Sequence, residues 1–67
     1  MEAIVIFQVN GIEIKTMGKG PDISSIPEAG KRNMIVLNAM SNIKKELGLD
    51  LYELDNNINK KAVVVYK

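Results

Sequence analysis

The sequence predicts a small α+β domain in which a three-stranded antiparallel sheet packs against one main helix. Three features predict this fold: an Asn-Gly dipeptide between two alternating apolar runs, a helical period in the middle of the chain, and a β-branched run near its end. A chain of 67 residues has room for one hydrophobic core, so we expect residues 1–67 to form a single domain.

Residues 3–17 are expected to form a β-hairpin with strands over 3–9 and 12–17. Asn10 and Gly11 both tolerate a positive φ, which a type I′ turn requires at its two central positions. This turn places Val9 opposite Ile12, and the strand period of two then collects six apolar side chains on one face, the core face. They are Ala3, Val5, Phe7, Val9, Ile12 and Ile14.

The opposite face of the hairpin, called the second face, is polar only near the turn. Near the turn it carries the polar residues Gln8, Glu13 and Lys15. Toward the open end it carries the apolar residues Ile4, Ile6 and Met17. An antiparallel sheet with one solvated face normally alternates cleanly between apolar and polar residues. Apolar residues on both faces therefore indicate that something covers the second face.

Residues 18–30 are rich in Gly, Pro and Ser and are expected to form a loop that contains the start of a helix. Ser25 and Glu28 have the spacing of a capping box, with Pro27 tolerated in the first turn. Gly30 is unfavourable inside a helix, so the alternative start is Lys31. This loop could also fold back across the second face and cover it without a partner.

Helical periodicity is clearest from Lys31 to Leu47. Apolar residues three and four apart form one stripe that is expected to pack on the hairpin, and Gly48 stands where a C′ glycine ends a helix. The stripe consists of Val36, Ala39, Met40, Ile43 and Leu47. The opposite, polar face carries Lys31, Met34, Asn38, Ser41, Asn42 and Lys45.

Two further elements are predicted after Gly48. Asp50 and Glu53 again have capping-box spacing and predict a short helix over 51–58, with a strand over 51–55 as the alternative. The run 62–66 is rich in valine and is expected to be a strand, apolar on both faces and therefore covered on both sides. The predicted order is ββααβ, or ββαββ if the alternative holds.

The composition argues against several kinds of chemistry. The chain has no cysteine and no histidine, which removes disulfides, the commonest metal ligands and the usual acid–base group. Its serines have no histidine to act as a base, and no pattern pairs them with its carboxylates. We therefore expect no catalytic residues, no metal, no cofactor and no enzymatic activity. No stretch approaches the about 20 apolar residues that span a bilayer, and we expect a cytoplasmic protein without a membrane partner.

These observations favour a non-catalytic interaction module that forms a homodimer or docks on a protein partner through an apolar sheet face. The residues expected at this interface, called the apolar patch, are Ile4, Ile6, Met17, Val63 and Val65. The alternative is a small nucleic-acid-binding or regulatory protein that uses the polar face of the main helix. Its candidate contacts are Lys31, Asn38, Asn42 and Lys45. The net charge of +1 makes this alternative the weaker one.

Overall fold

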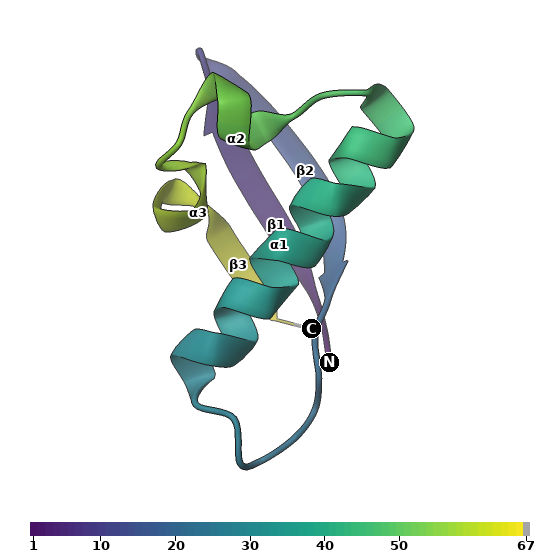
Figure 1. Ribbon diagram of the computed structural model, residues 1–67, viewed down its shortest axis with the longest axis vertical. Helices are drawn as coiled ribbons and strands as arrows, with labels where there is room; N and C mark the ends of the chain where they lie inside the picture. Colours follow the sequence, from purple (N-terminus) through teal and green to yellow (C-terminus); the bar gives the residue numbers. More distant parts are fainter. Residues whose placement is uncertain (67) are drawn as a thin grey trace.

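The computed structural model of the protein describes residues 1–66 and has the predicted α+β fold (Figure 1). All three strands are antiparallel, in the sheet order β2-β1-β3, and the helices lie on one side of the sheet. The elements are β1 (Glu2–Val9), β2 (Ile12–Lys19), α1 (Glu28–Leu47), α2 (Leu51–Leu54), α3 (Ile58–Lys61) and β3 (Val63–Tyr66).

The hairpin has the predicted turn and register. Asn10 and Gly11 have φ values of 52° and 78°, as a type I′ turn requires, and Val9 pairs with Ile12. The ladder continues beyond the predicted strands, because Met1 and Gly20 also exchange two backbone hydrogen bonds, with N···O distances of 3.0 and 3.2 Å. β1 therefore has a full-length neighbour on one side and β3 on the other.

The start of α1 differs from the predicted capping box. The helix begins at Glu28, its N-cap residue is Pro27, and no side chain caps it, so the prediction that Ser25 caps the helix was wrong. The alternative start at Lys31 was also wrong, because Gly30 is accommodated within the first turn. The end of the helix was predicted correctly: Gly48 has φ 69° and donates its backbone N–H to the Lys44 carbonyl oxygen at 2.9 Å.

The predicted helix over 51–58 is split into α2 and α3. Asp50 caps α2 by accepting hydrogen bonds from the backbone N–H groups of Tyr52 and Glu53. Asp55 then adopts an extended conformation, and its carboxylate accepts the N–H of Asn57 at 3.0 Å, which turns the chain before α3. Neither a continuous helix nor the alternative strand over 51–55 was correct.

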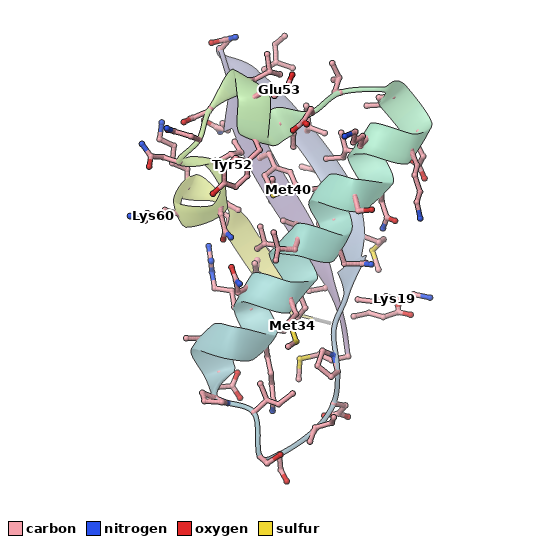
Figure 2. The ribbon with its side chains drawn as sticks, viewed as in Figure 1. Lys19, Met34, Met40, Tyr52, Glu53 and Lys60 are labelled. Carbon is pink, nitrogen blue, oxygen red and sulfur yellow. The ribbon has the colours of Figure 1, made fainter. Side chains whose placement is uncertain are left out.

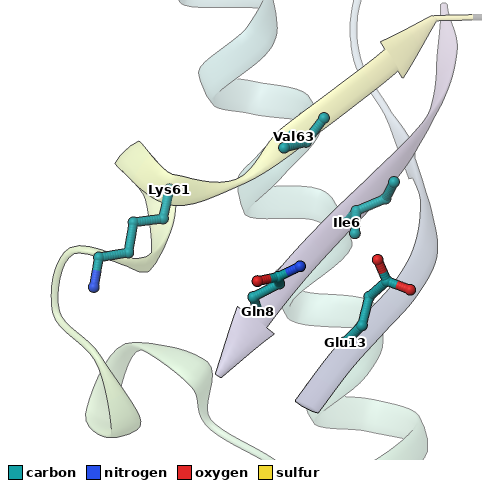
Figure 3. A pocket seen from close by; sticks show the side chains of 5 residues that line it. All are labelled: Ile6, Gln8, Glu13, Lys61 and Val63. Atoms are coloured by element: carbon teal, nitrogen blue, oxygen red, sulfur yellow. The ribbon is translucent and has the colours of Figure 1, made fainter. Parts of the chain in front are cut away.

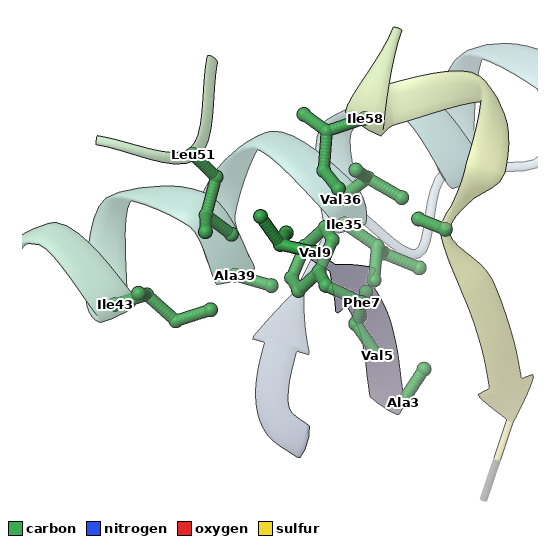
Figure 4. Packing of buried hydrophobic residues seen from close by; sticks show 11 residues of the cluster. Ala3, Val5, Phe7, Val9, Ile35, Val36, Ala39, Ile43, Leu51 and Ile58 are labelled. Atoms are coloured by element: carbon green, nitrogen blue, oxygen red, sulfur yellow. The ribbon is translucent and has the colours of Figure 1, made fainter. Parts of the chain in front are cut away.

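The core lies between the sheet and the three helices (Figure 4). Four of the six predicted core-face residues are buried and Ile14 is partly buried. Ile12 has the predicted register at the hairpin tip but is exposed, so its expected place in the core was wrong. On α1 the stripe is displaced toward Ile35, and Leu47 is exposed because it lies in the last turn of the helix. The core consists of Ala3, Val5, Phe7, Val9, Ile35, Val36, Ala39, Ile43, Leu51, Ile58 and Ala62.

Two contacts set the position of α1 on the sheet. Gly18 of β2 lies directly beneath Ile35, where an added Cβ would be 2.5 Å from the Ile35 carbonyl oxygen. At the other flank, Nη2 of Arg32 donates to the carbonyl oxygens of Asn59 at 3.2 Å and Ala62 at 2.6 Å. The helix is thus held to β2 by close backbone packing and to the start of β3 by a charged donor.

Candidate protein interface

The register of the sheet brings all five residues of the apolar patch together. Ile4 pairs with Met17 on β2 and with Val65 on β3, and Ile6 pairs with Val63. Their neighbours along the chain, Val5 and Val64, belong to the core side, so the strand period directs the patch away from α1. Side chains from three strands thus form one continuous surface on the second face.

The apolar patch is open to solvent within residues 1–66. Val63 and Val65 are 54% and 47% exposed, and Ile4, Ile6 and Met17 are half-buried by their neighbours. The loop between β2 and α1 does not cover the patch, because Gly20 at its start packs against Ile35 on the helix side of the sheet. Within the described residues the apolar patch is therefore exposed, and the loop between β2 and α1 does not cover it.

Charged and polar side chains border the apolar patch at both ends. At the open end of the hairpin, Lys19 and Glu2 lie 3.9 Å apart (Nζ to Oε1), and at the turn end Lys15 and Glu13 lie 3.9 Å apart (Nζ to Oε2). All four side chains are about half exposed or more, so these pairs contribute little to stability. An apolar centre with a polar rim is the usual composition of a protein interface.

The turn end of the second face is hollowed (Figure 3). The hollow has a volume of about 460 Å³ and is lined by Ile6, Gln8, Glu13, Lys61 and Val63. The Lys61 ammonium is turned toward Asp55, with 2.8 Å between Nζ and Oδ2. This hydrogen bond, with the one from the Asn57 N–H, lowers the pKa of the Asp55 carboxyl. Among the residues that line the hollow, Glu13 is the acidic one.

The two edges of the sheet differ. On β2, the outward-facing backbone groups are partly occupied by α1: the Lys19 N–H donates to Oδ1 of Asn38 at 2.8 Å, and Nδ2 of Asn42 donates to the Met17 carbonyl oxygen at 3.1 Å. On β3, alternation of the ladder directs the backbone groups of Val64 and Tyr66 outward. β2 is therefore a protected edge, and β3 is a short apolar one.

The four candidate nucleic-acid contacts do not share one exposed surface. Lys31 is only 8% exposed and lies 3.7 Å from Glu28 (Nζ to Oε1), whereas Lys45 is exposed about four turns further along α1. Asn38 and Asn42 are close to each other, 3.5 Å apart between Oδ1 and Nδ2, but their amides serve the β2 edge. The structure brings the two asparagines together and separates the two lysines.

The described part of the chain has neither the side-chain geometry of a metal site nor a helix suited to cross a membrane. Within residues 1–66, no group of three or more Asp and Glu side chains is arranged to hold a metal ion. None of the helices in this range has the length and apolar character needed to cross a membrane.

Comparison with known proteins gives no relative. No protein-family model, curated protein or solved structure shows a significant match to this chain. Its functional candidates are therefore those that its own surface supplies.

Proposed function

We propose that this chain is a non-catalytic interaction module that binds a protein surface through the apolar patch. The observation that supports it most is the convergence of Ile4, Ile6, Met17, Val63 and Val65, from all three strands, on the sheet face opposite the helices. Contiguous exposed apolar area with a polar rim is typical of a protein-binding surface.

The energetic reason is the small size of the chain. A domain of this length buries a smaller share of its surface than a larger one and gains comparatively more from binding a partner. Apolar area removed from water contributes roughly 25 cal/mol per Å². Covering Val63 and Val65, which are about half exposed, therefore adds stability that the isolated chain lacks.

The nucleic-acid alternative has less support. A phosphate-binding face needs several accessible cations, and Lys31 is buried beside Glu28. Direct base readout by asparagine needs a free amide, and the amides of Asn38 and Asn42 are engaged with β2. Lys45 is the accessible member of the set.

Site-specific photo-crosslinking in the cells that produce the protein tests the proposal. A photoreactive residue at Val63 should yield a discrete protein adduct, whether with a second copy or with another protein. The matched control is the same residue at Leu37, which is 46% exposed but lies on α1. Val65→Glu in the Val63-labelled chain should abolish the adduct, because it places a charge within the patch, next to Ile4. Equal adducts from Leu37 and Val63, or none from Val63, would refute the proposal.

A further inference from the structure

The residues of the second face form four rows across the sheet. The two central rows hold the apolar patch: Met17, Ile4 and Val65 in one, and Lys15, Ile6 and Val63 in the other. The row at the open end consists of Lys19 and Glu2. The row at the turn end consists of Glu13 and Gln8, with Lys61 beside them at the hollow. On β2, the row at the open end therefore carries a cation, Lys19, and the row at the turn end carries an anion, Glu13.

A two-fold axis that lies above this face, parallel to the sheet, perpendicular to the strands and between the two central rows, packs the face against its copy. Ile4 then lies over Ile6 of the second copy, Val65 over Val63, and Met17 over the stem of Lys15. At the ends, Lys19 lies over Glu13 of the second copy, and the symmetry repeats each contact. The strands of the two sheets run nearly antiparallel, within the about 30° at which sheets commonly pack face to face.

We infer that the partner of the apolar patch is a second copy of this chain, packed face to face in this orientation with Lys19 against Glu13. The inference rests on the proposed function and specifies its partner. The surface is self-complementary because opposite charges face each other at both ends and apolar residues of β1 and β3 face each other between them.

The side chains that make this contact are available for it. The Lys19 side chain is 74% exposed and extends away from β2 (Figure 2), and its present partner Glu2 is 3.9 Å away. The Glu13 side chain is 50% exposed, its present partner Lys15 is 3.9 Å away, and it borders the hollow at the turn end (Figure 3). In this arrangement Lys19 of the second copy lies over Glu13 on β2, and Glu2 of the second copy lies over Gln8 beside the hollow.

The other face-to-face arrangement, with the two-fold axis along the strands, is less complementary. It places Glu2 against Glu2 of the second copy, and like charges facing each other oppose association. It also requires Lys61 to pair with Glu13, although the Lys61 ammonium already binds Asp55 at 2.8 Å. Charge complementarity therefore selects the first arrangement.

The size of the face predicts a reversible dimer. Seven residues on each of β1 and β2 and the four residues of β3, with strands about 4.8 Å apart and about 3.4 Å per residue, give a flat area on the order of 300 Å² per copy. A standard stable interface buries about 800 Å² per partner. A face this small predicts a weak, reversible dimer, so the measurements should extend from low to high micromolar concentration.

Charge reversal and its complementation test the arrangement by sedimentation equilibrium. K19E places two acidic side chains against each other at both ends, and E13K does the same with two basic ones. Each variant alone should dimerise at least about 10-fold more weakly than the wild type. An equimolar mixture of K19E and E13K, and the double variant K19E/E13K, should recover dimerisation because every facing pair again joins opposite charges. Circular dichroism controls for folding of each variant.

Several outcomes would overturn this inference. A wild-type chain that stays monomeric at high micromolar concentration would do so, and it would leave the proposed function intact if Val63 still yields adducts with another protein. Failure of the K19E and E13K mixture to recover dimerisation would exclude this orientation. Loss of the dimer in Val64→Pro but not in K19E would assign association to the outward backbone of β3 instead.

Discussion

Asn38 and Asn42 illustrate how single side chains protect a sheet edge. They stand one helical turn apart on α1, and together they occupy one donor and one acceptor on the outer side of β2, at Lys19 and Met17. An exposed strand edge is a template for unwanted pairing with another chain. The two amides therefore stabilise the fold and leave less of the β2 backbone open to other strands.

Replacing Asn42 with Ala should destabilise the fold by about 1 kcal/mol, the usual net value of one such hydrogen bond. Asn38→Ala should have a similar cost and should accelerate hydrogen exchange of the Lys19 amide, which loses its acceptor. Urea unfolding and amide exchange measure both effects. Ser41→Ala, at an exposed position on the same helix, is the control and should be neutral or slightly stabilising. Loss of nucleic-acid binding without loss of stability would favour the alternative function.

Gly18 should not tolerate a methyl group. In Gly18→Ala the new Cβ meets the Ile35 carbonyl oxygen at 2.5 Å, and backbone cannot rotate away as a side chain can, so we expect a loss of about 2–3 kcal/mol. Gly30→Ala makes the same chemical change on α1, where the nearest atom is a side-chain carbon of Ile26 at 3.2 Å. It should be neutral or stabilise by up to about 1 kcal/mol. Equal urea midpoints for the two variants would contradict the close contact.

Asp55 should contribute stability that depends on pH. The hydrogen bond from Lys61 lowers the pKa of its carboxyl in the folded state, so the contribution is complete above the unfolded pKa of about 3.9 and is lost as pH falls through the lower folded value. Asp55→Asn should be less stable than the wild type at pH 7, and the difference should shrink toward about pH 2.5. Urea unfolding at both pH values measures it. A difference that stays constant with pH would exclude this ionic contribution.

At the scale of elements, the hairpin was predictable because its determinants are local. Asn10 and Gly11 fix the turn, the turn fixes the register, and the register fixes which residues share a face. The start of α1 was not predictable in this way. Ser25 and Glu28 have the right spacing, yet the loop reaches α1 through Pro27, and packing of Ile35 on Gly18 positions the helix instead.

The candidate interface was predictable in its residues but not in its surroundings. Alternation along the strands places Ile4, Ile6 and Met17 on one face whatever the rest of the chain does. The roles of Asn38 and Asn42 depend on how α1 crosses β2, and no local pattern encodes that crossing. A pair of asparagines four residues apart on the flank of a helix is the one sequence signal that pointed to them.

At the scale of the whole molecule, the fold has two layers, and every helix within residues 1–66 lies on the same side of the sheet (Figure 1). A two-layer arrangement leaves one sheet face without a cover. In most such folds that face is polar, whereas here its centre holds five apolar side chains from three strands. The apolar patch therefore lies on the sheet face that the helices leave uncovered, and association with a partner would bury it.

If association covers this face, thermal stability should depend on protein concentration. A folded dimer in equilibrium with unfolded monomers gains about 0.7 kcal/mol per chain for each tenfold rise in concentration once the dimer dominates. For a chain of this size that corresponds to a rise in Tm of about 3–5 °C, measurable by circular dichroism from micromolar to millimolar concentration. Val65→Glu should make Tm independent of concentration, whereas Leu37→Glu, an equally exposed change on α1, should preserve the dependence. A wild-type Tm that does not change over this range would mean that the second face stays open in the free protein and that its partner is a different molecule.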